Sequence, residues 1–186
     1  MADFPRIEED GRKAGLCKER ARLKPGRYKE MRDARERMAK RKLTKEEKEA
    51  TELVRQRMKE SQATELLGFD VESVHKGRAI FGLNVHSKHK QIHGVVHGGI
   101  LAALADTTAA IAAYSAVPKG TEIATVELTI NFLEPVPGGR IKADARVLRA
   151  GRNFVVTECD IFNEDGSLAA KALLTFGAAA GHNIQK

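Results

Sequence analysis

Cysteine is scarce in this chain and tryptophan is absent. The two cysteines, Cys17 and Cys159, stand 142 positions apart, and neither belongs to a CxxC pair. This spacing excludes a disulfide-stapled scaffold and a cysteine-rich zinc site. Unpaired thiols are typical of a reducing compartment, so we expect the protein to act in the cytoplasm.

Long apolar runs are also missing. The first residues include two glutamates and no apolar stretch of the kind that a signal peptide needs. The most apolar segment, residues 100–117, is rich in alanine and contains Asp106 and several hydroxyl residues. A membrane-spanning helix would be rich in leucine and free of charge, so this segment predicts a buried helix and no membrane span.

Charge is distributed unevenly over the 186 residues, whose net charge is +7. Residues 1–60 contain 20 basic and 13 acidic residues, whereas residues 61–186 contain 12 of each and seven of the nine aromatic residues. We therefore predict a neutral globular domain over residues 61–182, preceded by a basic extension over residues 1–60.

The extension has the composition of two thin helices. One is expected over residues 27–42, and Thr44 with Glu47 forms a capping box that starts another. Their apolar stripes are too narrow for a core, so they must pack on the domain or on a partner. They are either a solvated helical pair or, through their positive charge, a contact surface for nucleic acid. A short helix over residues 63–67 should end at Gly68.

The remaining pattern predicts an α+β domain. Residues 69–75 and 78–84 form a hairpin around Gly77, and Gly98-Gly99 opens the alanine-rich helix. Four strands should then follow as a meander, over residues 122–133, 140–150, 153–163 and 168–177. Alanine side chains let a helix lie close to a curved surface, so we expect an antiparallel sheet wrapped around this central helix.

Four histidines precede the central helix, at positions 86, 89, 93 and 97. Their spacing would line one face of a helix and suggests a metal site. Gly94 and the lack of apolar spacing favour a loop instead. We therefore predict no metal site here.

The start of the central helix is the segment most suggestive of chemistry. Two glycines expose backbone amides at the positive end of the helix dipole, where an anion or a developing oxyanion is stabilised. Asp106 follows among apolar residues, where a carboxylate is costly unless it is hydrogen-bonded or used. The residues alone leave open a plain entry turn with a structural acid.

Geometry limits how these groups can cooperate. Gly98 and Asp106 are eight residues apart, which is about 12 Å along a helix axis. They cannot reach one carbonyl group from the same chain. If they act together, two chains must pair about a two-fold axis, which predicts an obligate dimer with two shared sites.

The order of several motifs resembles the hotdog-fold acyl-CoA thioesterases, in the branch of the phenylacetate-pathway (PaaI-like) enzymes. The resemblance covers about residues 61–182. It is carried by His97-Gly98-Gly99 with an acid nine residues after the histidine, by the stretch from Thr125 to Pro135, and by the Gly151-Arg152 and Asp165-Gly166 turns.

The resemblance implies roles for individual residues. Asp106 is expected to act as general base or as nucleophile, and the Gly98 amide as oxyanion donor. His97 and Gln91 should orient the thioester, and Thr125 should hold the attacking water. Gln91 stands where phenylacetyl-type enzymes have asparagine, while the hydroxybenzoyl-type branch has glutamine there but glutamate at the acid position, so the acyl group stays open.

The resemblance also implies the surroundings of the site. Gly99, Thr107, Gly151 and Arg152 are expected to contact the substrate, although Arg152 is equally consistent with a structural role. The expected substrate is an acyl-CoA, the expected assembly a homodimer that pairs into a tetramer, and no cofactor is implied. The alternative is a non-catalytic acyl-CoA sensor whose basic arm binds nucleic acid. A hotdog dehydratase is disfavoured because its motif places the aspartate before the histidine.

Overall fold

The computed structural model describes residues 42–180. The helix predicted over residues 27–42 and the rest of the basic arm before residue 42 therefore lie outside the described residues, apart from Lys42. The helices are α3 (Lys45–Glu60), α4 (Gln62–Leu67) and α5 (Gly98–Tyr114). The strands are β1 (Phe69–His75), β2 (Arg78–Asn84), β3 (Thr121–Phe132), β4 (Arg140–Ala150), β5 (Phe154–Phe162) and β6 (Leu168–Ala180).

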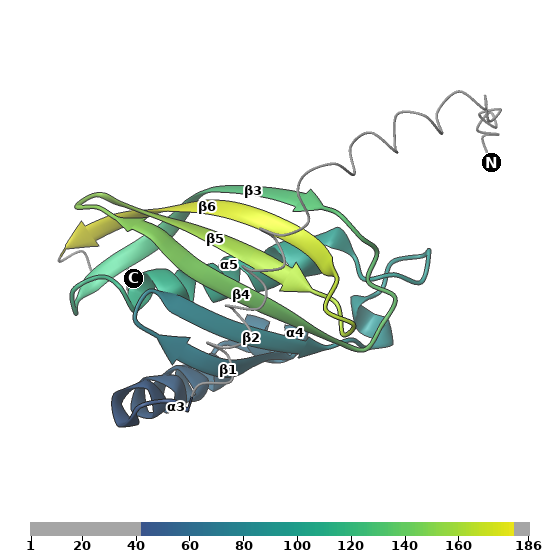
Figure 1. Cartoon of the computed structure of the whole chain (residues 1–186), viewed down its shortest axis with the longest axis horizontal. Helices are drawn as coiled ribbons and strands as arrows, with labels where there is room; N and C mark the ends of the chain where they lie inside the picture. Colours follow the sequence, from purple (N-terminus) through teal and green to yellow (C-terminus); the bar gives the residue numbers. More distant parts are fainter. Residues whose placement is uncertain (1–41, 181–186) are drawn as a thin grey trace. The chain divides into compact units, whose positions relative to one another are not determined.

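The six strands form one antiparallel sheet in the order β1-β2-β4-β5-β6-β3 (Figure 1). The predicted meander is confirmed for β4, β5 and β6 and is wrong for β3. Strand β3 pairs with β6 at the far edge of the sheet, and the connection over residues 133–139 returns the chain to β4. The reason is that α5 carries the chain along the sheet before β3 begins, so β3 joins the edge opposite β1.

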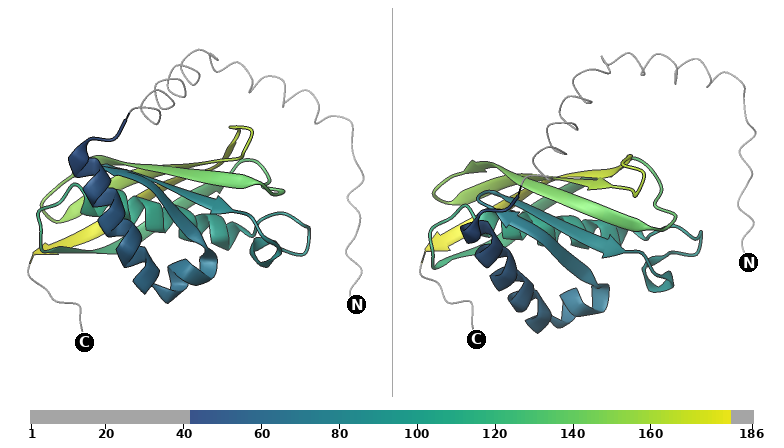
Figure 2. Two further views of the ribbon diagram at one scale, coloured as in Figure 1. Left: turned by 90° about the horizontal axis from the view of Figure 1, so that it is seen from below. Right: turned by 60° about the horizontal axis from the view of Figure 1, so that its bottom comes forward.

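Helix α5 packs on the inner face of the sheet, and the sheet curves around it as predicted (Figure 2). Its buried face consists of two leucines and small residues: Leu101, Leu104, Ala105, Thr108, Ala109, Ala112 and Ala113. Because alanine has only a methyl group, the helix backbone can approach the strands closely. Large side chains from the sheet, including Phe81 and Phe176, fill the remaining space.

The alternation of apolar and polar residues predicted for the later strands is confirmed. It places the apolar side chains on the inner face of the sheet and the charged side chains on the outer face. In β5, Val155, Thr157 and Cys159 are buried on the inner face. On the outer face, cross-strand ion pairs replace apolar packing, as where Lys171 lies 2.7 Å from Asp160. Opposite charges on neighbouring strands favour one register over others.

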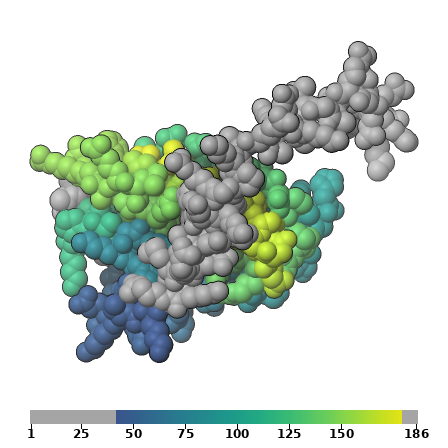
Figure 3. All heavy atoms as spheres, in the orientation of Figure 1, coloured from purple at the N-terminus to yellow at the C-terminus, as the bar shows by residue number. Residues whose placement is uncertain are grey.

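Helix α3 covers the outer edge of β1. The Thr51 hydroxyl accepts a hydrogen bond from the Val74 amide at 2.9 Å, and the Arg55 guanidinium donates to the Val71 carbonyl at 2.8 Å. Figure 3 shows the dark blue atoms of α3 directly against the neighbouring blue-green part of the molecule. The Thr44 capping box is present, as predicted.

These contacts group α3 with the sheet, since the chain forms one compact unit from Leu43 onward. The sequence predicts a boundary at residue 60, where the net charge changes, and that boundary between functional parts stays a prediction. The two divisions differ because a narrow apolar stripe does not stop a helix from docking through polar side chains. Within residues 42–180, no helix has both the length and the apolar character that crossing a bilayer requires.

Candidate active site

The first turn of α5 presents one backbone amide without a partner. His97 is the N-cap residue, and its Nδ1 atom accepts a hydrogen bond from the Gly99 amide at 2.9 Å. The His97 carbonyl accepts from the Ile100 amide at 2.9 Å. No described residue accepts a hydrogen bond from the Gly98 amide, which therefore remains available at the positive end of the helix.

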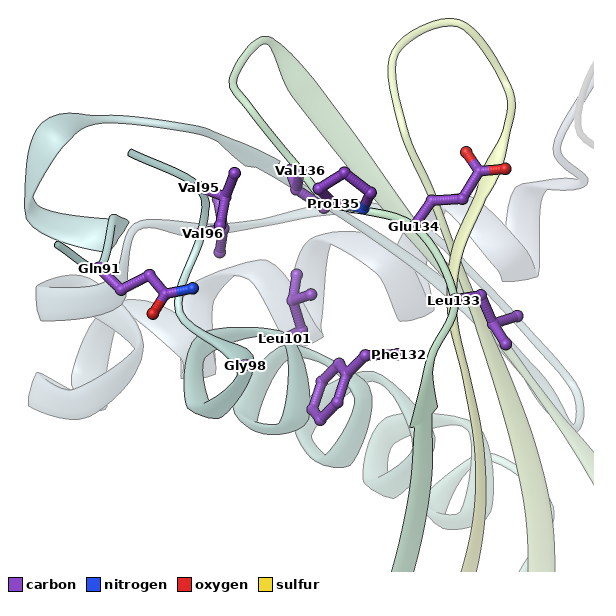
Figure 4. Close-up of a pocket in the computed structure, with 10 residues that line it drawn as sticks. All are labelled: Gln91, Val95, Val96, Gly98, Leu101, Phe132, Leu133, Glu134, Pro135 and Val136. Atoms are coloured by element: carbon purple, nitrogen blue, oxygen red, sulfur yellow. The ribbon is translucent and has the colours of Figure 1, made fainter. Parts of the chain in front are cut away.

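A cavity of about 350 Å³ lies beside this turn (Figure 4). In the close-up, the Gln91 side chain extends toward the helix start and the Phe132 ring faces the first turns of α5, whereas Leu133 and Glu134 point away. The cavity is lined by Gln91, Val95, Val96, Gly98, Leu101, Phe132, Leu133, Glu134, Pro135 and Val136. Its lining is thus mostly apolar, with Gln91 and Glu134 as the polar side chains and Gly98 at the helix start.

The space beside Gly98 is too tight for a side chain unless Phe132 shifts slightly. A Cβ atom on Gly98 would lie 3.0 Å from the Cζ atom of Phe132, which is closer than such contacts normally are. Sequence reasoning did not predict the contact between Phe132 and Gly98. The sequence contains no signal for it, because Phe132 and Gly98 are 34 positions apart and meet only through the β3–β6 pairing.

The loop between β2 and α5 forms one wall of the cavity. It contains a short 3₁₀ helix, Ser87–His89, and a tight turn in which the Gln91 amide donates to the Val95 carbonyl at 2.8 Å. The Val96 amide donates to the Val136 carbonyl at 2.9 Å. The prediction of a loop is confirmed, and the histidines do not line a helix face. No cluster of potential metal ligands is found in residues 42–180.

Asp106 and Thr125 form a second polar group. The Thr125 hydroxyl donates to the Asp106 Oδ1 atom at 2.9 Å. A break in the pairing of β3 with β6 falls between Thr125 and Glu127, and such bulges redirect a side chain out of the regular strand pattern. Asp106 is half-buried on the face of α5 that the sheet leaves uncovered, so it is not sealed in the core.

The two groups are separate within one chain. Neither Asp106 nor Thr125 lines the cavity at Gly98, and two helical turns, about 12 Å, separate Gly98 from Asp106. One chain therefore presents an amide with a cavity at one place and a carboxylate with a hydroxyl at another.

The other residues predicted to contact the substrate do not lie together in one chain. The Gly99 amide is occupied by His97, and Thr107 lies half-buried beside Asp106 on α5. Gly151 and Arg152 are exposed in the turn between β4 and β5 and do not line the cavity. Their contact with substrate stays a prediction.

The cysteine of the described residues is not accessible. Cys159 is fully buried on the inner face of β5, and this burial raises the pKa of its thiol far above the usual range. A thiol that cannot ionise does not attack a thioester, so Cys159 has a packing role.

Comparison with known proteins decides the family. A model of the thioesterase superfamily matches residues 93–170, from the site loop to β6. A 1,4-dihydroxy-2-naphthoyl-CoA hydrolase of Listeria monocytogenes is 31% identical over 104 residues, which cover 56% of this chain and 85% of the hydrolase. The chain belongs to the thioesterase superfamily. It is therefore an enzyme of the thioester hydrolase class, as predicted.

Solved structures of the thioesterase superfamily share the fold. A thioesterase of Haemophilus influenzae is 26% identical, with a TM-score of 0.68 over 79% of this chain and 98% of that one. The PaaI protein from the phenylacetic acid degradation operon of E. coli is 27% identical, with a TM-score of 0.65 over 71% of this chain and 94% of that one. The predicted hotdog fold is confirmed.

Proposed function

We propose that this thioesterase hydrolyses an acyl-CoA to a free acid and coenzyme A, at sites shared between two protomers. The Gly98 amide carries the proposal, because it is unpartnered at a helix start and opens on a mostly apolar cavity. Such a donor stabilises the oxyanion that forms when a thioester carbonyl is attacked. The hydrolase from Listeria monocytogenes supports a CoA thioester as the substrate class.

Pairing of two protomers is supported by the exposed surface next to Asp106. Strand β3 ends the sheet, and no strand of the described chain pairs with its outer edge. Val126 and Phe132 are exposed by 63% and 53%. The adjacent face of α5 carries the small residues Ala102 and Ala103, which permit close helix approach. A two-fold axis beside β3 would bring Asp106 of one protomer toward Gly98 of the other. Further pairing into a tetramer stays a prediction.

The proposed hydrolysis assigns one task to each group. The acyl group enters the cavity, the carbonyl oxygen takes the Gly98 amide, and the Gln91 amide orients the thioester. Thr125 occupies Oδ1 of Asp106, so Oδ2 accepts a proton from water. The water oxygen bonds to the carbonyl carbon and the C–S bond breaks. The departing sulfur takes up the proton that Asp106 accepted, which gives the free thiol of coenzyme A.

Asp106 as nucleophile is the second form of the same proposal. Its carboxylate would attack the carbonyl carbon and form a mixed anhydride as the C–S bond breaks and coenzyme A leaves, and water would then attack the Asp106 carboxyl carbon to release the acid. A single turnover in ¹⁸O-labelled water distinguishes the two forms. Label enters the product acid directly under general-base catalysis, whereas a nucleophilic carboxylate delivers its own unlabelled oxygen to the acid and becomes labelled itself.

The test is release of free thiol from a panel of aromatic, short-chain and long-chain acyl-CoAs, with wild type and Asp106→Asn. We expect wild-type turnover on at least one class and a loss of about 10²–10⁴-fold in kcat for the variant, because the amide cannot accept the proton. Asp165→Asn, an exposed acid in the β5–β6 turn, is the matched control and should keep the wild-type rate. An Asp106→Asn enzyme with near-native turnover would reject the role of Asp106.

A further inference from the structure

His89 is buried although it lies in a largely exposed loop. Only 2% of its surface is accessible, while Lys88, Lys90, Gln91 and Ile92 around it are exposed. Its Nδ1 atom accepts a hydrogen bond from the His86 amide at 3.0 Å, and its carbonyl accepts from the His97 amide at 2.9 Å. One residue thus joins His86, near the start of the loop that lines the cavity, to His97 at its end.

The same segment closes the end of helix α4. The Gly68 amide donates to the Thr64 and Glu65 carbonyls, which leaves the Leu66 and Leu67 carbonyls without helical donors. The Lys88 ammonium donates to the Leu66 carbonyl at 2.5 Å. The Leu67 carbonyl acts on the His89 ring and raises its pKa, against the larger effect of burial. The loop is therefore fixed to α4 by the Lys88 side chain, and the buried His89 ring lies next to that anchor.

The contacts require a neutral imidazole. Because Nδ1 accepts a hydrogen bond, the ring proton is on Nε2, which is buried without a hydrogen bond of good geometry in the described part of the chain. Burial lowers the pKa of His89, and the charges of Lys88 and His86 lower it further. Lys88 and His86 belong to the loop itself, and the Leu67 carbonyl at the end of α4, which raises the pKa, is uncharged.

We propose that His89 is a positioning residue for thioester hydrolysis: its buried imidazole ties the β2–α5 loop together through the His86 amide and, beside the Lys88 anchor on α4, holds Gln91 and the Gly98 turn in register around the cavity. This inference rests on the proposed function. It assigns no contact between His89 and substrate. It also gives α4 a task in the site, through the loop and without entering the cavity.

Two substitutions separate the hydrogen bond from the bulk of the ring. His89→Phe keeps an aromatic ring without an acceptor, whereas His89→Asn places an amide oxygen near the position of Nδ1. We expect His89→Phe to lower kcat by about 10²-fold, because misplacement of groups by about 1 Å costs that much. His89→Asn should retain most of the turnover. His93→Asn, an exposed loop residue, is the control and should match wild type.

Hydrogen exchange provides a readout independent of turnover. In His89→Phe, the amides of residues 86–97 should exchange faster, while those of β4 and β5 stay protected. Faster exchange and lower kcat in His89→Phe, with both restored in His89→Asn, support the proposal. Wild-type exchange and turnover in His89→Phe would overturn it.

The pH dependence gives a second test, which also applies if His89→Phe does not fold. A histidine whose pKa is lower in the folded loop stabilises the loop fully above about pH 6.5, and this contribution is lost as the pH falls below that value. Loop exchange in wild type, corrected for intrinsic rates, should rise between pH 7.5 and 5. The rise should be absent in His89→Asn. An equal rise in His89→Asn would overturn the role of the imidazole.

Failure of this inference differs from failure of the proposed function. If wild type hydrolyses acyl-CoA and His89→Phe does so equally well, only the positioning role is wrong. If wild type releases no thiol from any acyl-CoA, the proposed function is wrong, and the exchange data alone then decide whether His89 holds the loop.

Discussion

The two edge strands of the sheet differ in what covers their outer edges. At β1, helix α3 satisfies edge groups with the Thr51 hydroxyl and the Arg55 guanidinium. At β3, the outer edge meets no strand of the described chain, and apolar side chains such as Val126 stand exposed. Open edges invite pairing with another chain, so proteins cover those that must stay single.

The comparison of the two edge strands indicates which side of the sheet carries the predicted catalytic residues. Asp106 and Thr125 lie beside the open β3 edge, and Phe132 at the end of β3 meets Gly98. No predicted catalytic residue lies at the covered β1 edge. We infer that one edge is closed for stability and that the other is reserved for a second protomer, which completes the site.

The largest effect expected from breaking this arrangement, after the loss of Asp106, comes from removing the Gly98 amide. Proline suits the first residue of a helix, and His97 before it is already extended, with ψ of 134°. Gly98→Pro should therefore fold and lower kcat by about 10²–10³-fold, the usual effect of losing an oxyanion donor. Thiol-release kinetics measure it.

Gly98→Ala is the matched control for that variant. Both substitutions place a Cβ atom against Phe132, but alanine keeps the N–H group. The difference between the two variants therefore reports on replacing the N–H donor by the proline Cδ, with the Cβ contact held constant. Equal losses in both would assign the effect to crowding by Phe132 and would remove the oxyanion role from Gly98.

Mixing Gly98→Pro with Asp106→Asn tests whether the site is shared. In a mixed dimer, one site carries both defects and the other carries neither, so random reassociation should restore about a quarter of the wild-type rate. The measurement is thiol release after mild dissociation and reassociation of the two variants. No recovery above the two separate variants would contradict a shared site.

A smaller, indirect loss of activity is expected from a substitution on the open β3 edge. Val126→Glu places a charge on β3 beside the proposed interface and should shift the protein to monomers with reduced turnover. Leu53→Glu is the matched change at the covered edge, since Leu53 on α3 is 57% exposed against 63% for Val126. It should leave both properties unchanged. Sedimentation velocity and thiol release measure the pair, and a fully active monomer would refute the two-protomer site.

The smallest effect on turnover is expected at the covered edge. Thr51→Val removes the acceptor of the buried Val74 amide and should lower the free energy of unfolding by about 1–3 kcal/mol. Thr51→Ser keeps the hydroxyl and should lose less. Urea unfolding measures both, with kcat of the folded protein unchanged. Equal stability of Thr51→Val and wild type would show that α3 does not protect this edge.

Several features could be predicted from local sequence because local contacts decide them. The Thr44 capping box, the left-handed Gly68 and the hairpin at Gly77 each depend on residues a few positions apart. The alternation in β5 followed from a period of two. The position of β3 could not be predicted in this way, since antiparallel pairing with β6 or with β4 suits the same strand pattern.

The candidate site shows the same division between features that depend on local sequence and features that depend on the tertiary structure. The glycine turn and the acid two turns later are visible in the sequence, and helix geometry alone shows that they cannot meet within one chain. Only the tertiary structure showed that the Gly99 amide is taken by His97 while the Gly98 amide is not. It alone brought Phe132 against Gly98, Thr125 against Asp106 and His89 into the loop interior. These contacts join residues whose meeting depends on the course of the whole chain, and no local propensity encodes that.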